Sequence, residues 1–492
     1  MDLLTLDDYS NGFLGGQQEA ALGLLKAMQA GQITGRDTVD QALTMEPLKA
    51  ESLETTLKLL EYRMKDVVLY NKMPKLTAYN TVEEFLQLES YGTDRGGFYA
   101  EGELSDNEDS TYRRRANFVK YIQVTGEVTM QAQMVKSFVD AMRQEAENKT
   151  MWIIRRAAKA LTKANSNIVP QEWNSLFAQH ASVGAGDAYL YSTLESYYTN
   201  QVVYDLRGES LKQEDVEKAA VIIDGNYGNV SDIFAPTSVL SALSQDYYGD
   251  QRIMMNSGGY EGKIGTVAKI ISTTIGDVAL NPDKFMKADD AKTTTTAATS
   301  LKAPNAPTSN DDVVVAADSS SKYQAGEIGT VYYAVSAINR YGESALTLID
   351  ATATTLVAAQ SVTFSFVDGG GAVAATGYRI YRTKVTSAGS AAGLSFYNIF
   401  DISAAELAAG YDGAAAGSVR DRGRVLPDTE SAFLTEMDES VLSYKQLAPV
   451  SKLDLAVISM SRRFIAFTFA TPMLYQPKKM VKFINCSKVA TT

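Results

Sequence analysis

A strand followed by a long helix gives the clearest hydrophobic pattern in the chain. The segment Tyr121–Thr129 alternates β-branched and polar residues, which predicts a half-buried strand. Beyond it, apolar residues recur at intervals of three, four or seven and predict one apolar stripe on a helix that ends at 165–167. The stripe consists of Val135, Phe138, Met142, Ala146, Ile153, Ala157 and Leu161. At 1.5 Å per residue, this helix would be about 45 Å long.

A charged segment precedes this strand and is too polar to lie in a core. The carboxylates within 98–110 and the arginines that follow them are Glu101, Glu103, Asp106, Glu108, Asp109, Arg113, Arg114 and Arg115. Because the two runs are only a few residues apart, pairing them within one chain would need a tight reversal. We therefore interpret them as an intersubunit contact, in which each run faces opposite charge on a neighbour. A loop that is merely solvated is the alternative.

The N-terminal part of the chain is less regular. Its first 45 residues are punctuated by glycine and glutamine and predict an arm or a loosely held leader. Regularly spaced leucines predict a helix over 48–64, and Val67–Tyr70 then begins an extended run. Strand-like sequence follows over 77–88 and leads into the charged segment.

Two shorter helices are predicted further along the chain. The first runs over 211–223 and stops at the turn 225–228, with Ser210 as its N-cap and Gln213 as the capping-box partner. The second covers 238–245, and a strand is predicted over 264–273.

The composition changes after Asn281–Pro282, where Thr, Ala, Gly and Ser dominate and leave little room for long helices. Short alternating segments between glycine turns predict a separate β sandwich here. The main composition returns after Pro427, and 453–460, 464–471 and 480–485 read as buried strands. We therefore interpret the β domain as an insertion in a domain that closes with the C-terminal segment.

Composition and charge limit the class of protein. With 492 residues, 45% of them hydrophobic, the chain can form several domains and at least one large core. Its formal net charge of −12 gives no general attraction to nucleic acid or anionic lipid. The single cysteine, Cys486, excludes an internal disulfide framework, as expected for folding in a reducing cytoplasm. The chain start lacks the features of a signal peptide, and no stretch is long enough to span a bilayer.

Two segments invite a catalytic or nucleotide-binding interpretation. Residues 258–263 resemble a phosphate-binding loop, but the first glycine is displaced and Ile264 stands where Ser or Thr would bind magnesium. Ser210 lacks the second glycine of a nucleophile elbow. His180 is the only histidine, so one chain cannot form a His-based zinc site, and a structural role is favoured.

Metal binding and thiol chemistry are weighed in the same way. Asp106, Glu108 and Asp109 could bind calcium, yet Thr111 occupies the position where an EF-hand loop requires glycine. Cys486 is most simply a small packed residue. We therefore expect no catalytic residue, cofactor or metal.

The order and spacing of these segments resemble the HK97-like major capsid proteins of tailed bacteriophages, particularly those of large contractile-tailed phages with an Ig-like insertion. The resemblance rests on the run 48–70, the acidic loop 98–109 ahead of a basic strand and the long helix after it. It rests equally on 211–236 and on the closing segment 442–484. Within the β domain, Tyr332–Ser344 and Gly377–Arg382 resemble fibronectin type III and related Ig-like modules, with the two motifs in reversed order.

This resemblance implies an α+β fold and a division of the chain. The implied parts are an N-terminal arm (1–70), an extended loop with flanking strands (71–133), a peripheral domain with a spine helix (134–200), a first part of the axial domain (201–300), an inserted Ig-like β domain (301–424) and closing strands of the axial and peripheral domains (425–492).

The resemblance also implies a structural protein rather than an enzyme. Such a major capsid protein self-assembles as hexamers and pentamers into an icosahedral head shell around a phage double-stranded DNA genome, without tight specific binding to the DNA. Scaffold, portal and decoration proteins would be further partners, no membrane is involved, and the virion would be assembled in the host cytoplasm. An encapsulin-like nanocompartment shell protein and an Ig-like surface adhesion protein are the alternatives. The first shares the fold, whereas the missing signal peptide argues against the second.

Overall fold

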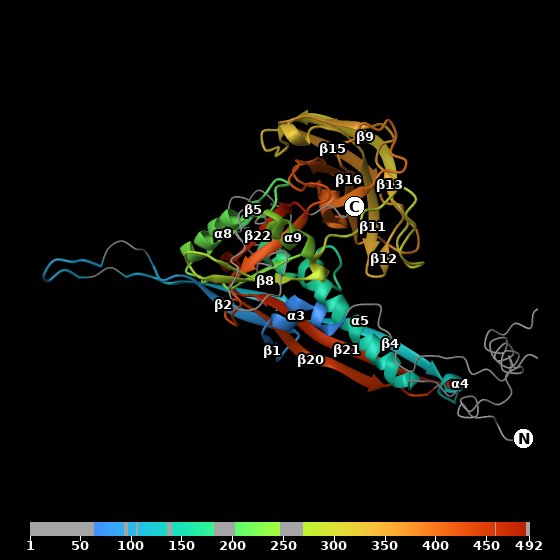
Figure 1. The fold of residues 1–492 in the computed structure, drawn as a ribbon, viewed down its shortest axis with the longest axis horizontal. Helices are drawn as coiled ribbons and strands as arrows, with labels where there is room; N and C mark the ends of the chain where they lie inside the picture. Colours follow the sequence, from blue (N-terminus) through green and yellow to red (C-terminus); the bar gives the residue numbers. More distant parts are fainter. Residues whose placement is uncertain are drawn as a thin grey trace, which may run out of the picture. The chain divides into compact units, whose positions relative to one another are not determined.

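A computed structural model describes residues 63–92, 97–104, 107–134, 140–181, 202–246, 269–457 and 459–488 (Figure 1). The predicted arm over 1–45, the helix 48–64 except its last two residues, and the phosphate-loop-like segment 258–263 lie outside these residues. The chain combines helices with sheets whose strands pair mainly antiparallel, which confirms the predicted α+β class.

The first structural layer is a four-stranded sheet covered by helices. Its strands run in the order β1-β20-β21-β4, with β1 parallel to β20 and the other pairs antiparallel. Its elements are β1 (Lys75–Thr77), β4 (Lys120–Thr129), β20 (Leu442–Asp454), β21 (Ser461–Leu474) and the helices α3 (Val68–Lys72), α4 (Met130–Met134), α5 (Ala141–Lys163) and α6 (Leu176–Ala181). The strand predicted over 121–129 is therefore confirmed, and it pairs with a strand more than 330 residues later.

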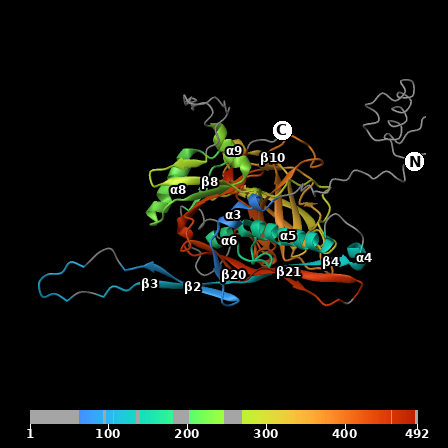
Figure 2. The same ribbon diagram turned by 60° about the horizontal axis from the view of Figure 1, so that its bottom comes forward.

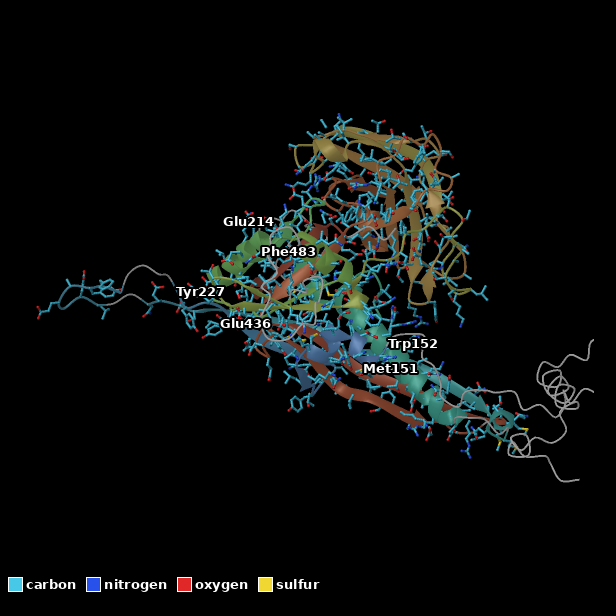
Figure 3. All side chains as sticks on the ribbon, in the orientation of Figure 1. Met151, Trp152, Glu214, Tyr227, Glu436 and Phe483 are labelled. Carbon is cyan, nitrogen blue, oxygen red and sulfur yellow. The ribbon has the colours of Figure 1, made fainter. Side chains whose placement is uncertain are left out.

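The long predicted helix is present as α5. It has 23 residues, and thus a length of about 35 Å, because Asp140 caps its N-terminus by accepting a hydrogen bond from the Met142 amide at 2.9 Å. Ile153, Ala157 and Leu161 of the predicted stripe are buried. Val135 and Phe138 lie outside the described residues. Figure 3 labels two neighbours on α5, of which Met151 packs against the core while Trp152 is 38% exposed.

The extended run predicted from Val67 is wrong, because Val68–Lys72 forms the short helix α3. The cause is a distant cap. The buried carboxylate of Asp283 accepts a hydrogen bond from the Leu69 amide at 2.9 Å, across 214 positions of sequence. It also accepts one from the Phe285 amide at 2.8 Å, so one side chain holds two segments together.

The second layer is a six-stranded mixed sheet in the order β5-β22-β19-β6-β8-β7. Its elements are β5 (Val203–Asp205), β6 (Asp232–Ala235), β7 (Ile270–Ser272), β8 (Asp277–Pro282), β19 (Glu430–Thr435), β22 (Met480–Cys486) and the helices α8 (Gln213–Gly225) and α9 (Thr237–Asp246). Phe483 of β22 belongs to a buried cluster with Val216, Ala219 and Ile223 of α8 (Figure 3). Phe234 and Phe433 face the other way and join the core beneath α5, so the two sheets share buried side chains.

Two local predictions in these layers are corrected. Helix α8 begins at Gln213, and its N-cap is Lys212 rather than Ser210, because the Asp215 carboxylate accepts a hydrogen bond from the Lys212 amide at 3.0 Å. The buried strand predicted over 453–460 is also wrong. Strand β20 ends at Asp454 and β21 begins at Ser461, and Leu453, Val457 and Met460 are exposed rather than buried. The strands expected over 464–471 and 480–485 are present within β21 and β22.

Between Thr308 and Asp421 lie ten short strands, one short α-helix and the 3-10 turn Ala325–Glu327, in line with the short strands predicted there. The strands and the α-helix are β9 (Thr308–Ala317), β10 (Gly329–Val331), β11 (Tyr333–Asn339), β12 (Gly342–Glu343), β13 (Thr347–Leu348), β14 (Thr354–Leu356), β15 (Gln360–Val367), β16 (Gly377–Thr383), β17 (Phe396–Ser403), β18 (Ser418–Asp421) and α10 (Ala404–Ala409). The sheet of β11, β12, β13, β16 and β17 and the sheet of β9, β15 and β18 bury one common core.

A buried ionic group joins these two sheets. The Asp421 carboxylate of β18 accepts hydrogen bonds from Arg382 of β16 at 2.6 Å, from Tyr323 at 2.7 Å and from Tyr333 of β11 at 2.9 Å. Burial raises the pKa of Tyr333 well above its ordinary value. Removing Asp421 would therefore leave a buried guanidinium without its carboxylate, which is costly in a protein interior.

We predict an acid-dependent loss of stability from His180. Its imidazole is fully buried in α6, its Nε2–H donates to the Met480 carbonyl at 2.7 Å, and burial lowers its pKa from 6.5 to about 4. Between these values the unfolded chain binds a proton that the folded chain does not, so the free energy of unfolding should fall by up to about 3 kcal/mol on acidification.

Urea unfolding at pH 7 and near pH 4 checks this expectation. His180→Gln keeps a donor for the Met480 carbonyl but cannot titrate, so it should lose less stability than the wild type over the same interval. An equal loss in both proteins would show that carboxylates alone cause the acid sensitivity.

Candidate assembly surface

The predicted charged segment forms the outer part of a two-stranded hairpin. Strand β2 (Val82–Ser90) pairs with β3 (Thr111–Phe118), with Val82 opposite Phe118 and Leu86 opposite Arg114. The described residues contain no third strand hydrogen-bonded to this pair. Figure 2 shows the two strands running together beyond the helices and sheets, with the charged segment at their far end.

The base of the hairpin is fixed to the strands β20 and β21. Asn117 donates a hydrogen bond to the Pro472 carbonyl at 2.9 Å, and the rings of Phe85 and Tyr475 meet edge to face at 5.0 Å. Lys445 pairs with Glu83 at 2.6 Å. Burial raises the pKa of Glu83, but Lys445 and two backbone amides outweigh it and lower the pKa below its ordinary value. The base is therefore well supported.

The arginine run lies in β3, and the structure gives two of its side chains partners on the same hairpin. Arg114 forms an ion pair with Glu84 of β2, although the two side chains are 70% and 41% exposed. Arg115 donates to Gln87 at 2.6 Å. Pairing within the chain needs no tight reversal, because the partners lie on the adjacent strand rather than in the acidic run.

The acidic run lies at the far end of the hairpin. Glu101, Glu103, Glu108 and Asp109 are exposed, and Asp106 lies outside the described residues. Glu103 accepts a hydrogen bond from the Ala100 amide at 2.8 Å, which closes a local turn. Gly92 has a φ of +124°, and a Cβ there would lie 2.9 Å from Glu108 Oε2, so glycine lets the two limbs approach.

Sequence reasoning missed the apolar side chains on the same hairpin. Phe98 is fully exposed, Leu104 is 91% exposed and Tyr91 is 85% exposed. Leu86 and Tyr112 are exposed on the strands themselves. The sequence did contain a signal for this surface, namely large apolar residues inside a charged loop. A loop that is only solvated does not favour such residues.

The described residues bear on metal binding, membrane insertion and thiol chemistry. They contain no group of three or more His, Cys, Asp or Glu residues that could hold a metal ion. No helix in the described ranges is long and apolar enough to cross a membrane. Cys486 is fully buried, and burial raises the pKa of its thiol, which fits the packed structural role predicted for it.

Comparison with known proteins points to one family. Residues 38–338, more than half of the chain, match the family described as SU10 major capsid protein. The chain is 22% identical to a putative major capsid protein of Enterococcus phage phiEF24C, over 90% of this chain and 91% of the relative. It is also 22% identical to a major capsid protein of Staphylococcus phage K, over 92% and 93% of the two chains.

Among solved structures, the capsid of the cyanophage P-SCSP1u is similar with a TM-score of 0.43 and 7% identity, over 94% of this chain and 98% of that one. The family match bears out the resemblance to phage capsid proteins and favours it over an encapsulin or a surface adhesin. The chain belongs to the SU10 major capsid protein family and is a structural major capsid protein of the virion.

Proposed function

We propose that copies of this chain assemble into a closed icosahedral shell through the β2–β3 hairpin, each hairpin lying against a neighbouring subunit. The hairpin carries the proposal because its large apolar side chains have no cover within the described part of their own chain. Hexamers and pentamers would tile the shell in the host cytoplasm, and double-stranded DNA would be packaged inside it. With a net charge of −12, the shell would hold that DNA without tight binding.

The apolar and the charged side chains of the hairpin would contribute different amounts of binding energy. Full burial of a Phe or Leu side chain stabilises a contact by about 1.5 to 3 kcal/mol. An exposed ion pair contributes about 0.2 to 1 kcal/mol. Phe98 and Leu104 would therefore provide most of the binding energy, and the charges would select the orientation and the partner. Each subunit is held by several neighbours, so individually weak contacts suffice.

The contact would include Glu101, Glu103, Asp106, Glu108, Asp109, Arg113, Arg114 and Arg115. Intrachain pairing does not prevent this, because Arg114 remains 70% exposed and an arginine can bind two carboxylates at once. We further propose that 301–424 is an Ig-like accessory domain on the outer face. Its separate core supports this.

Charge reversal in the arginine run should block assembly without unfolding the subunit. In Arg114→Glu with Arg115→Glu, the subunit loses one exposed ion pair, worth no more than about 1 kcal/mol, and the Arg115–Gln87 hydrogen bond, worth about 0.5 to 1.5 kcal/mol. Every copy of the contact in a shell gains repulsion. Circular dichroism should show a folded chain, and sedimentation should show no particles. Arg143→Glu, which reverses an exposed, ion-paired arginine on α5, is the matched control and should form shells. Shells from the double variant would mean that these charges are merely solvated.

Apolar contacts at the hairpin tip should matter more than its charges. Phe98→Ser with Leu104→Ser leaves the free subunit folded, because both side chains are exposed there. If a neighbour buries them, assembly should require a subunit concentration at least about tenfold higher, from the loss of several kcal/mol per contact. Light scattering against subunit concentration measures this, with Leu301→Ser as an exposed apolar control on another segment. If the subunit concentration needed for assembly did not change, the hairpin tip would not be part of the contact.

Deleting the β domain tests whether it is accessory. Replacing 304–422 by a short Gly-Ser bridge should leave shells of normal diameter under the electron microscope. The subunit should lose some thermal stability, because Arg207 would no longer meet the Lys322 carbonyl at 2.6 Å or its ion-pair partner Glu327. Aggregation, or folded subunits that form no particles, would show that the domain is needed for the shell.

A further inference from the structure

A cavity of about 290 Å³ lies where the β domain rejoins the rest of the chain. Separate parts of the fold supply its walls: Thr162 and Lys163 end α5, Asn398 belongs to β17, and Lys482 belongs to β22. Arg424, on the segment that leaves the β domain, completes the set. Any molecule in this space would touch both the inserted domain and the layers that carry it.

The cavity wall carries more positive than negative side chains. Among the residues that the structure describes, seven lysines and arginines line it, against five aspartates and no glutamate. The carboxylate of Asp289 forms ion pairs with two of these cations, Lys163 at 2.7 Å and Arg379 at 3.1 Å. Burial raises the pKa of Asp289, but Arg379 and Lys163 outweigh it and hold the pKa at about 2. Asp289 therefore stays charged, whereas burial raises the pKa of Asp401. The lining side chains together keep a positive excess.

Lys482 places one of these cations in a half-buried position on the cavity wall. Its Nζ lies 4.1 Å from the centre of the Phe177 ring. Burial lowers its pKa from 10.5 to about 8, because the interior disfavours the charged amine. An anion held in the cavity would favour the protonated form and move the pKa back toward its ordinary value.

Polar atoms of the wall add hydrogen-bonding capacity. Thr162 is only 4% exposed, and its buried Oγ1 has no hydrogen-bond partner within the described ranges. Asn398 donates to Asp401 at 3.0 Å, yet its buried Oδ1 likewise has no partner there. Buried polar atoms are nearly always paired, so both point to a polar occupant.

We infer that this cavity binds a small hydroxylated organic anion, with a phosphate or carboxylate group near Lys482 and hydroxyl groups near Thr162 and Asn398. The anion would hold the β domain against α5 and β22. This inference goes beyond shell assembly and does not depend on it, because the cavity is formed within a single chain.

Binding is tested on the purified full-length chain by isothermal titration calorimetry. Sulfate serves as the probe for a phosphate-like group and citrate as the probe for carboxylates. At least one should bind and raise the thermal unfolding temperature. Titrations near pH 8 in two buffers of different ionisation enthalpy should reveal proton uptake on binding, and titrations near pH 6 should not, because Lys482 is already protonated there. Absence of binding by both probes would overturn the inference.

Variants locate the bound anion. Lys482→Met should weaken binding at least about tenfold, as expected for loss of a charged hydrogen bond, and should abolish proton uptake. Lys478→Met, an exposed lysine outside the cavity wall, is the matched control and should bind as the wild type does. Thr162→Val keeps the shape of the wall but removes a hydroxyl, and should also weaken binding. If Lys482→Met fails to fold, the Thr162→Val variant alone shows whether the anion binds in this cavity. Binding that survives these substitutions, or is lost equally in the control, would place the anion elsewhere.

Discussion

A hairpin of two strands cannot bury both of its faces by itself, so its large apolar side chains need cover from elsewhere. Isolated two-stranded hairpins are marginally stable in water, and large apolar residues on them add an unfavourable exposed surface. Here the base is held by Asn117 and by the Phe85–Tyr475 ring contact, but Phe98 and Leu104 extend beyond any described cover. In the proposed contact, another subunit would supply the missing surface.

The support for the hairpin depends on segments from both ends of the described chain. Helix α5 packs on β4, β20 and β21, so a strand near residue 125 and two near the C-terminal end share one core. The same two closing strands support the base of the hairpin, β20 through Lys445 and β21 through Pro472, and Tyr475 follows directly after β21. The strands between Thr308 and Asp421 bury a core of their own, and ion pairs such as Asp289–Arg379 attach them to this frame. The proposal that this segment is an inserted accessory domain is consistent with that arrangement.

Features set by local sequence were predictable, and those set by distant contacts were not. Periodicity found α5 and its buried Ile153, Ala157 and Leu161, because a helix and the face it buries are encoded within a few turns. It failed at α3, whose cap is Asp283, 214 residues away. For the assembly surface, composition located the charged loop. The Arg114–Glu84 pair needed the strand register, and the exposed apolar residues needed knowledge of what covers them.

Amide hydrogen exchange of the hairpin, compared between free subunits and assembled shells, shows whether a neighbouring subunit covers it. If neighbouring subunits cover the hairpin, amides in 97–104 and 107–112 should exchange rapidly in free subunits and at least about tenfold more slowly in shells, while exposed amides at the N-terminal turn of α5 keep their rate. Equal exchange of the hairpin in both states would contradict the account, because it would leave the apolar side chains as uncovered in the shell as they are in the single chain.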